Sequence, residues 1–279
     1  MRLCYQVATP DVTVAESVTA YQGSLKKSFH DLAVLGYDGV ELMTRDPNSL
    51  DWDEVRGEAK ENGLGVTLVC TGEVYGQLGL NFADPDAGIR REAISRVETI
   101  IDFASYLGAN INIGRVRGHY TPGISKEQTR EWCAQALQEL GDYAAPKNVK
   151  IALETVTIMQ TNFINTMQEG VDMIKMVDRD NCAMMMDVFH LNLEEPDLCS
   201  AIRKYADYCI HVHLSDNNRR YPGNCGLDFG KIIRAFYESG YTGDFCTEIV
   251  QQPSMEAAAA GAIRHLAPIF NEVYGRAMR

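Results

Sequence analysis

Four side chains that can bind a divalent metal follow four consecutive apolar segments in the second half of the chain. They are Glu154, Asp187, His213 and Glu248. An unpaired charge beside an apolar run is costly, and one divalent cation removes that cost for all three carboxylates at once. The alternative is local pairing of each carboxylate with Arg or Lys, but it would have to recur at successive segment ends. We therefore predict a single metal site built from these four residues.

The chemistry of the four side chains also indicates which metal the site takes. Three carboxylates and one imidazole suit a hard to borderline ion, so Mn²⁺ is our first choice, with Co²⁺ or Mg²⁺ as alternatives. His211 lies two residues before His213 and points to the same face of its strand, so either can be the imidazole ligand. We prefer His213 because it lies nearer the end of the segment, with His211 in the core one layer below.

Short apolar segments alternate with helical patterns along the whole chain, and the candidate ligands lie at the ends of the last four segments. The predicted strands are Leu3–Val7, Gly39–Leu42, Val66–Cys70, Asn110–Ile113, Val149–Glu154, Ala183–Asp187, Cys209–Leu214 and Phe245–Ile249. The helical patterns are Ser24–Leu35, Asp51–Asn62, Asp84–Leu107, Lys126–Ala144, Thr166–Val177, Asp197–Tyr205, Gly230–Ser239 and Met255–Tyr274. Gly36, Gly108 and Gly240 separate a helical pattern from the next strand, which is where helices commonly end.

This alternation favours an α/β fold, a single (β/α)₈ TIM barrel, whose parallel strands are buried on both faces. An open doubly wound sheet is the runner-up, but no G-x-G-x-x-G follows the first strand and no P-loop sequence is present. No linker or low-complexity stretch divides the chain, so we predict one catalytic domain over residues 1–279. Functional side chains of such barrels gather at the C-terminal ends of the strands, which is where the four candidate ligands lie.

The composition argues against several classes of partner. The formal net charge is −12, which disfavours nucleic acid because nucleic-acid binding depends on Lys and Arg. No segment approaches the ~18–20 apolar residues of a membrane span. The first residues lack the apolar stretch of a signal peptide, and the cysteines contain no C-x-x-C pair. We expect a soluble, reduced, cytoplasmic protein with neither a nucleic-acid nor a membrane partner.

Two motifs in the C-terminal half carry a family resemblance. Asp-x-Phe-His begins at Asp187, and His-x-His-x-x-Asp-x-x-Arg begins at His211. Together they resemble the sugar isomerase/epimerase superfamily of xylose-isomerase-like barrels, and are most similar to the ketose 3-epimerases that act on tagatose and allulose. The layout of the whole chain is similar to that family. The resemblance implies that Glu154, Asp187, His213 and Glu248 are the metal ligands, and that the two glutamates are also the catalytic acid/base pair.

The same resemblance implies two substrate-binding residues and shows two departures from the family pattern. His190 and Arg219 would contact substrate oxygens. Gln160 stands where the family has a substrate-binding Glu six residues after the first ligand. The Gly-rich turn that follows the Arg in the family appears here as residues 222–226, with its second Gly displaced. Both departures bear on the identity of the substrate.

Such a site suits proton transfer beside a carbonyl. A metal held by a ketone oxygen and a neighbouring hydroxyl stabilises the enediolate that forms when the adjacent proton leaves. One carboxylate can remove the proton and another can return it. Glu154 and Glu248 follow the fifth and eighth strands, so they can lie on opposite sides of a substrate. Return of the proton to the other face gives epimerisation, and return to the adjacent carbon gives aldose–ketose isomerisation.

Other polar residues near predicted strand ends have two interpretations each. Arg115, Arg117 and His119 follow the fourth strand. They could bind a carboxylate or phosphate, with His119 as a substrate-binding residue or an additional base. The alternative is a solvated loop whose arginines pair with nearby acids. Glu41 and Glu73, near the ends of the second and third strands, could each face the substrate, but a position at the surface or paired with Arg is expected.

We expect a small-molecule keto-sugar or sugar derivative as partner and a homo-oligomeric, metal-dependent epimerase or isomerase. The alternative is the metal-dependent catalytic subunit of a C-glycoside-cleaving, 3-keto-glycoside lyase-type enzyme, which would copurify with a small second subunit. An abasic-site nuclease shares the barrel but needs a basic DNA face and further metal ligands. A non-catalytic sugar-binding protein would not need four metal ligands.

Overall fold

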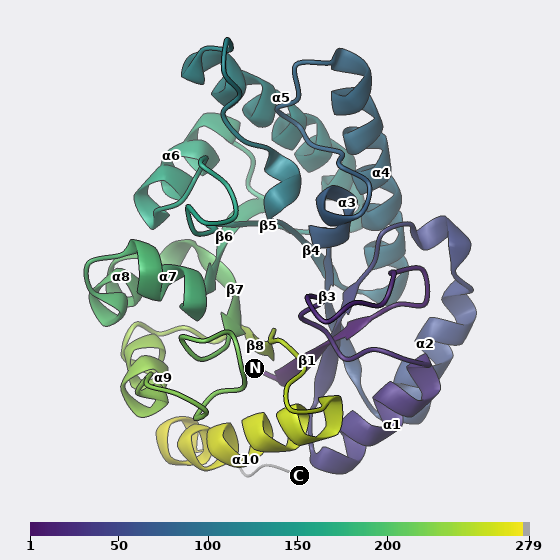
Figure 1. Cartoon of the computed structure of the whole chain (residues 1–279), viewed down its shortest axis with the longest axis vertical. Coiled ribbons are helices and arrows are strands. Elements are labelled where there is room, and N and C mark those ends of the chain that lie inside the picture. The colour runs from purple at the N-terminus through teal and green to yellow at the C-terminus, as the bar shows by residue number, and fades with distance from the viewer. Residues whose placement is uncertain (276–279) are drawn as a thin grey trace.

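Eight parallel strands close into a barrel in sequence order, with β8 hydrogen-bonded back to β1 (Figure 1). The computed structural model describes residues 1–275. The strands are β1 (Leu3–Ala8), β2 (Gly39–Met43), β3 (Gly65–Cys70), β4 (Asn110–Ile113), β5 (Ile151–Glu154), β6 (Cys182–Asp187), β7 (Cys209–Leu214) and β8 (Asp244–Thr247). The predicted (β/α)₈ TIM barrel is confirmed. The assignment of one domain to residues 1–279 stays a prediction, since residues 276–279 lie outside the described part.

Helices surround the barrel and connect its strands (Figure 1). They are α1 (Leu25–Leu35), α2 (Trp52–Glu61), α3 (Gly72–Gly76), α4 (Ala87–Leu107), α5 (Lys126–Ala144), α6 (Met167–Val177), α7 (Val188–Glu194), α8 (Leu198–Tyr205), α9 (Phe229–Glu238) and α10 (Met255–Tyr274). Most begin directly after a residue whose side-chain oxygen accepts a hydrogen bond from the first turn, as Ser24 does for α1 and Thr166 for α6. These caps satisfy N–H groups that have no partner within the helix.

Two short helices are missing from the predicted elements, and several strand bounds differ from the predicted ones by one or two residues. The helices α3 and α7 have five and seven residues and were not predicted, because so few residues show no clear helical period. Helix α7 follows β6 directly and α3 follows β3 after one residue, and both lie at the C-terminal end of the barrel, where they place residues beside the candidate ligands. Strand β8 ends at Thr247, so Glu248 follows the strand, whereas the sequence placed it inside.

The strands separate a large outer core from a small inner one. Alternate residues of a strand face opposite sides of the sheet. One side packs against the helices and forms the main apolar core. The other side faces the inside of the barrel, where Met43, Leu68, Ala152 and Met185 belong to a second, smaller apolar cluster. Polar residues with the same alternation therefore face inward with them, and these include Gln6, Glu41, Glu154, Asp187, His211 and His213.

No helix in residues 1–275 is both long enough and apolar enough to cross a membrane.

Candidate metal and active site

The four predicted ligands lie together at the C-terminal ends of β5 to β8. Each of Glu154, Asp187, His213 and Glu248 offers one nitrogen or oxygen atom, and these atoms all lie within 4.8 Å of one another. All four residues are buried. Ligands that share one divalent ion at ~2.0–2.3 Å must lie at about this separation. The four residues lie close together because the C-terminal ends of parallel strands all reach the same rim of the barrel.

Two atoms of this cluster are buried without any hydrogen-bond partner. They are the Nδ1 atom of His213 and the Oε1 atom of Glu154. The Nδ1 atom lies 2.7 Å from Oε2 of Glu248, and yet the two do not have the geometry of a hydrogen bond. It lies 3.8 Å from Oδ2 of Asp187. Buried polar atoms without partners are rare, and here their lone pairs converge on one point. The donor set therefore fits a divalent cation.

Each carboxylate of the cluster also accepts a hydrogen bond from a residue outside the cluster. Asp187 accepts a hydrogen bond from the backbone N–H of Phe189 at 2.8 Å, and it caps helix α7 in this way. Glu248 accepts one from the hydroxyl of Thr19 at 2.8 Å. Glu154 accepts a longer one, 3.3 Å, from the amide of Asn112. Each of these contacts uses one oxygen of the carboxylate, and the other oxygen faces the cluster.

Glu154 also depends on a glycine beside it. A Cβ atom at Gly114, just after β4, would lie 2.8 Å from Oε2 of Glu154. That separation is too short for a carbon and a carboxylate oxygen, so a side chain at residue 114 would push the carboxylate out of place. The position therefore requires glycine for close approach. Neither Asn112, Thr19 nor Gly114 was singled out from the sequence, which has no local signal for them.

Arg219 reaches the cluster from the loop after β7. Its Nη1 donates to Oδ2 of Asp187 and its Nη2 to Oε2 of Glu248, both at 2.5 Å. The guanidinium lies over the ring of Phe189, 5.1 Å from the ring centre. Burial lowers the pKa of Arg219, but Asp187 and Glu248 outweigh it and raise that pKa above the ordinary value. A permanent positive charge therefore lies at one side of the site.

Asp216 organises the loop that carries Arg219. Its buried carboxylate accepts hydrogen bonds from the backbone N–H groups of Gly223 at 3.0 Å, Cys225 at 2.8 Å and Leu227 at 3.1 Å. Gly223 has φ +86°, and a Cβ atom there would lie 2.4 Å from the His265 ring. The turn of residues 222–226 thus needs its glycine at 223, although its second glycine departs from the family pattern.

His190 lies on the first turn of α7 and is buried. Its Nδ1 accepts a hydrogen bond from the backbone N–H of Thr157 at 3.3 Å. Burial lowers the pKa of His190 to about 4. The ring is therefore neutral near pH 7, and because Nδ1 accepts, the proton is on Nε2. That Nε2 lies 3.9 Å from Oδ2 of Asp187, so its N–H is directed toward the cluster.

The two glutamates of the cluster lie in different electrostatic surroundings. Burial raises the pKa of Glu154, and the nearby Glu248 carboxylate raises it further. Burial also raises the pKa of Glu248, but Arg219 and His213 outweigh it and the net shift is downward. Environments that push two carboxyl pKa values apart are typical of acid/base pairs.

A hollow of about 360 Å³ opens onto this cluster. Glu154, Glu248, His190 and Arg219 line it, and Gln160 lies at its exposed rim. His119 does not belong to the residues of the described chain that line it; its ring packs edge-on against Tyr75, with 6.2 Å between ring centres. The structure thus brings together all the predicted ligands and substrate contacts except His119.

Arg117 and Glu41 have surroundings that differ from those expected from the sequence. Arg117 is fully buried and donates to the backbone carbonyls of Gly114, Phe163 and Ile164 at 2.7–3.0 Å. It is a structural clamp between loops, and neither a substrate contact nor part of a solvated loop. Arg115 does line the hollow, 3.5 Å from Glu73, as expected for an Arg-paired acid.

Glu41 lies in surroundings quite different from those expected from the sequence. The expectation of a surface or Arg-paired role was wrong, because its side chain is completely buried inside the barrel. Its Oε2 lies 2.9 Å from Nε2 of His211 and 2.8 Å from Nε2 of His213. The expectation that His211 lies in the core beneath the site agrees with its burial. Nothing near Glu41 in the sequence indicates this contact, since 170 residues separate it from His211.

A barrel with a buried polar cluster at the C-terminal ends of its strands has the architecture in which TIM-barrel enzymes place their active sites. The chain belongs to the xylose isomerase-like TIM barrel family, whose model matches residues 29–269.

Its similar relatives include several epimerases. A D-psicose 3-epimerase of Ruminiclostridium cellulolyticum is 29% identical over 233 residues, which cover 82% of this chain and 79% of that protein. A 3-dehydro-D-guloside 4-epimerase of Escherichia coli (strain K12) is 27% identical over 230 residues, with 79% and 85% covered. The crystal structure of D-psicose 3-epimerase with D-tagatose from Clostridium cellulolyticum H10 superposes with a TM-score of 0.78 at 26% identity, covering 96% of this chain and 92% of that one.

Proposed function

We propose that this protein is a divalent-metal-dependent epimerase that moves the proton on the carbon beside the carbonyl of a keto-sugar. The observation that carries the proposal is the pair of buried atoms without partners, His213 Nδ1 and Glu154 Oε1, within one cluster of potential ligands. Glu154, Asp187, His213 and Glu248 would hold the cation, with Mn²⁺ preferred over Co²⁺ and Mg²⁺ for this donor set. Relatives named as ketose 3-epimerases support a ketose as the substrate class.

The bound cation would polarise the substrate carbonyl and stabilise the negative charge that develops on its oxygen. Glu154 and Glu248 stand at the ends of β5 and β8, which are not neighbours in the barrel, so they can approach opposite faces of a substrate carbon. One glutamate takes the proton beside the carbonyl and the other delivers a proton to the opposite face. This exchange inverts one carbon, which is epimerisation.

The remaining site residues would hold and orient the sugar. His190 is neutral with its proton on Nε2, so it can donate a hydrogen bond to a substrate hydroxyl or carbonyl oxygen. Arg219 can place a positive charge beside the same oxygens, with Gln160 at the rim of the hollow. His119 lies outside the lining residues and is a weaker candidate for contact. The oligomeric state, a second subunit and the cellular location stay predictions.

The experiment that tests the proposal is a screen of metal-loaded protein against free ketoses in D₂O. A ketose is expected to be converted to its epimer, with deuterium at the inverted carbon because a carboxylate proton can exchange with solvent. Chemical analysis of the products separates epimers from aldoses, which would indicate isomerisation instead. Failure to convert any ketose in the presence of Mn²⁺ or Co²⁺ would exclude free ketoses as substrates.

A second candidate substrate class is favoured by a second hollow, of about 800 Å³, beside the first. The two hollows are lined by consecutive residues: Ser17, Arg219 and Val250 for the first, and Glu16, Arg220 and Gln251 for the second. The Cα atoms of consecutive residues are 3.8 Å apart, so the two hollows adjoin one another. A 3-keto-glycoside could place its keto-sugar in the first and its aglycone or second sugar in the second. The relative named as a 3-dehydro-D-guloside 4-epimerase acts on a glycoside by name.

This candidate is tested by comparing a 3-keto-glycoside with a free ketose. If the glycoside is the substrate, Arg220→Ala should lower kcat/KM for it and leave the value for a ketose unchanged. Arg203→Ala is the matched control, because Arg203 is an exposed arginine paired with Glu238 on the outer helices. Release of the aglycone would indicate the lyase-type reaction, and an epimeric glycoside would indicate epimerisation.

A further inference from the structure

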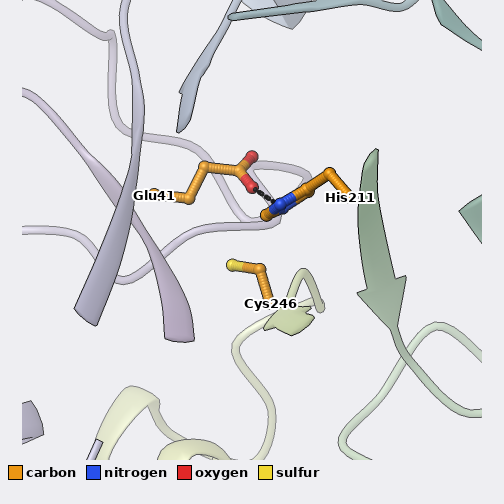
Figure 2. A group of neighbouring side chains, drawn as sticks. All are labelled: Glu41, His211 and Cys246. Carbon is orange, nitrogen blue, oxygen red and sulfur yellow. Dashed lines mark hydrogen bonds and ion pairs between the residues drawn. The ribbon is translucent and has the colours of Figure 1, made fainter. Parts of the chain in front are cut away.

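A carboxylate inside the barrel holds two histidines of β7 through one oxygen atom. Oε2 of Glu41 lies 2.8 Å from Nε2 of His213 and 2.9 Å from Nε2 of His211. Its other oxygen accepts a hydrogen bond of 2.6 Å from the amide of Gln6. Figure 2 shows the Glu41 carboxylate and the His211 ring pointing toward one another from opposite sides of the barrel interior. All these groups are buried.

The direction of these hydrogen bonds decides which nitrogen of His213 carries a proton. An ionised carboxylate only accepts, so both imidazoles must present an N–H at Nε2. In a neutral His213 ring the Nδ1 atom then has no proton, and its lone pair is free. That Nδ1 is the atom that lies without a partner among Glu154, Asp187 and Glu248. Glu41 thus selects the form of His213 that can bind a cation on its far side.

The barrel is irregular at the strands that carry this contact. The pairing of β2 with β3 shifts register between Val40 and Glu41. The pairing of β6 with β7 shifts between Met184 and Met185, which leaves Ile210 unpaired directly before His211. Such irregularities change the direction of neighbouring side chains, and they are common beside active sites. Both shifts lie at the Glu41–His211 pair.

Cys246 offers a different interpretation of the same cluster. It faces Glu41 and His211 (Figure 2), and these three residues could together surround a second cation. However, Oε2 of Glu41 already accepts from two imidazoles, and the Cys246 thiol is directed at the backbone carbonyl of Thr247 at 3.8 Å. The ligand atoms that a second cation would need are therefore already used in hydrogen bonds.

From these contacts we propose that Glu41 is a positioning residue, which fixes the tautomer and ring direction of His213 for metal binding at Nδ1. His211 and Gln6 hold Glu41 in place. The proposal rests on the proposed metal site, and it concerns a residue outside that site. Outer partners of metal-bound histidines typically account for ~10–100-fold in metal affinity.

The test measures Mn²⁺ affinity by calorimetric titration, with no substrate present. Glu41→Gln, which keeps the shape and removes the charge, should weaken Mn²⁺ binding by ~10–100-fold. Tyr205→Phe is the matched control: it removes one hydrogen bond between the outer helices α8 and α6, from the Tyr205 hydroxyl to the Gln168 side chain. This control should lose stability and keep the wild-type affinity. Unchanged affinity in Glu41→Gln would overturn the proposal.

A second measurement follows the proton directly in protein labelled with ¹⁵N-histidine and loaded with diamagnetic Zn²⁺, the state in which Nδ1 is the proposed ligand atom. In the wild type the His213 signal should show a proton on Nε2 and the metal on Nδ1, and in Glu41→Gln the two tautomers should mix. A proton on Nδ1 of His213 in the Zn²⁺-loaded wild type would overturn the proposal. So would two Mn²⁺ or Zn²⁺ ions per chain, one of them lost in Cys246→Ser, since Glu41 would then be a ligand. If the affinity and tautomer results hold but no sugar is converted, only the proposed function fails.

Discussion

Arg219 donates to Asp187 at 2.5 Å, so a fixed positive charge of the chain lies directly against one of the proposed metal ligands. Its second nitrogen donates to Glu248, another proposed ligand, at the same distance. The guanidinium therefore offsets part of the negative charge that the cluster concentrates inside the barrel. From this placement we predict two roles for Arg219 that can be separated by experiment, one in stability and one in substrate binding.

Replacing Arg219 by Gln should destabilise the metal-free protein by roughly 3 kcal/mol, because breaking a buried ion pair leaves its partners uncompensated. Added Mn²⁺ should reduce the difference in unfolding free energy between the variant and the wild type, since the cation then neutralises Asp187 and Glu248. Urea unfolding with EDTA and with Mn²⁺ measures both effects. Activity should remain low even in the Mn²⁺-loaded variant. Full activity there would show that Arg219 has no role in binding substrate.

Glu154→Gln and Glu248→Gln should each lower kcat by ~10²–10⁴-fold, because positioned acid/base groups contribute about this much. Each amide keeps an oxygen for the metal, so Mn²⁺ content measured by atomic absorption should fall much less than the rate. In D₂O, each variant is expected to exchange the substrate proton only on the face served by the remaining glutamate. Normal turnover in both variants would remove these residues from the proton transfer and direct attention to His190.

Removal of metal should abolish activity and lower thermal stability. EDTA-treated protein is expected to be inactive, and Mn²⁺ or Co²⁺ should restore it. A ligand at 100 times its Kd stabilises the folded state by about 2.7 kcal/mol, so Mn²⁺ should raise the Tm measurably. Asp187→Ala and His213→Ala should each lose most of this rise, because each removes one of the proposed protein ligands. A fully active preparation free of metal would contradict the proposed mechanism.

The acid sensitivity of the fold should depend in part on Asp244 at the start of β8. Asp244 accepts hydrogen bonds from the backbone N–H and the guanidinium of Arg2, both at 2.7 Å. Burial raises the pKa of Asp244, but Arg2 outweighs it and the net pKa is lowered. A folded pKa below the unfolded value means that the stabilisation is complete above the unfolded pKa of about 3.9 and is lost as pH falls through the folded pKa.

Asp244→Asn should therefore lower the free energy of unfolding by about 1 kcal/mol at pH 7, the size typical of a partly exposed pair. The difference from the wild type should shrink below about pH 3.9, where Asp244 of the unfolded chain takes up a proton, until the pH falls below the lower pKa of the folded state. Urea titrations at pH 7 and pH 3 measure it, with Asp207→Asn, an exposed residue, as the control. A difference that stays constant with pH would show that the Arg2 contact does not depend on the charge of Asp244.

The barrel and the four residues of its candidate metal cluster could be predicted from the pattern of residues along the chain. Apolar runs of strand length alternate with helical periods, and in a parallel barrel that pattern brings every strand end to one rim. Glu154, Asp187 and His213 could therefore be placed together without coordinates, because their strands are successive. Glu248 was also found, although its strand ends one residue before it.

The residues that support that cluster became known only from the folded barrel. Glu41 on β2 reaches His211 and His213 on β7 across the barrel interior, between strands that are not hydrogen-bonded neighbours. The buried clamp of Arg117 likewise depends on two loops more than 40 residues apart. Local periodicity reports which face of a strand a residue occupies. It contains no information on which distant side chain lies opposite once the barrel closes, because that depends on strand tilt, register shifts and packing together.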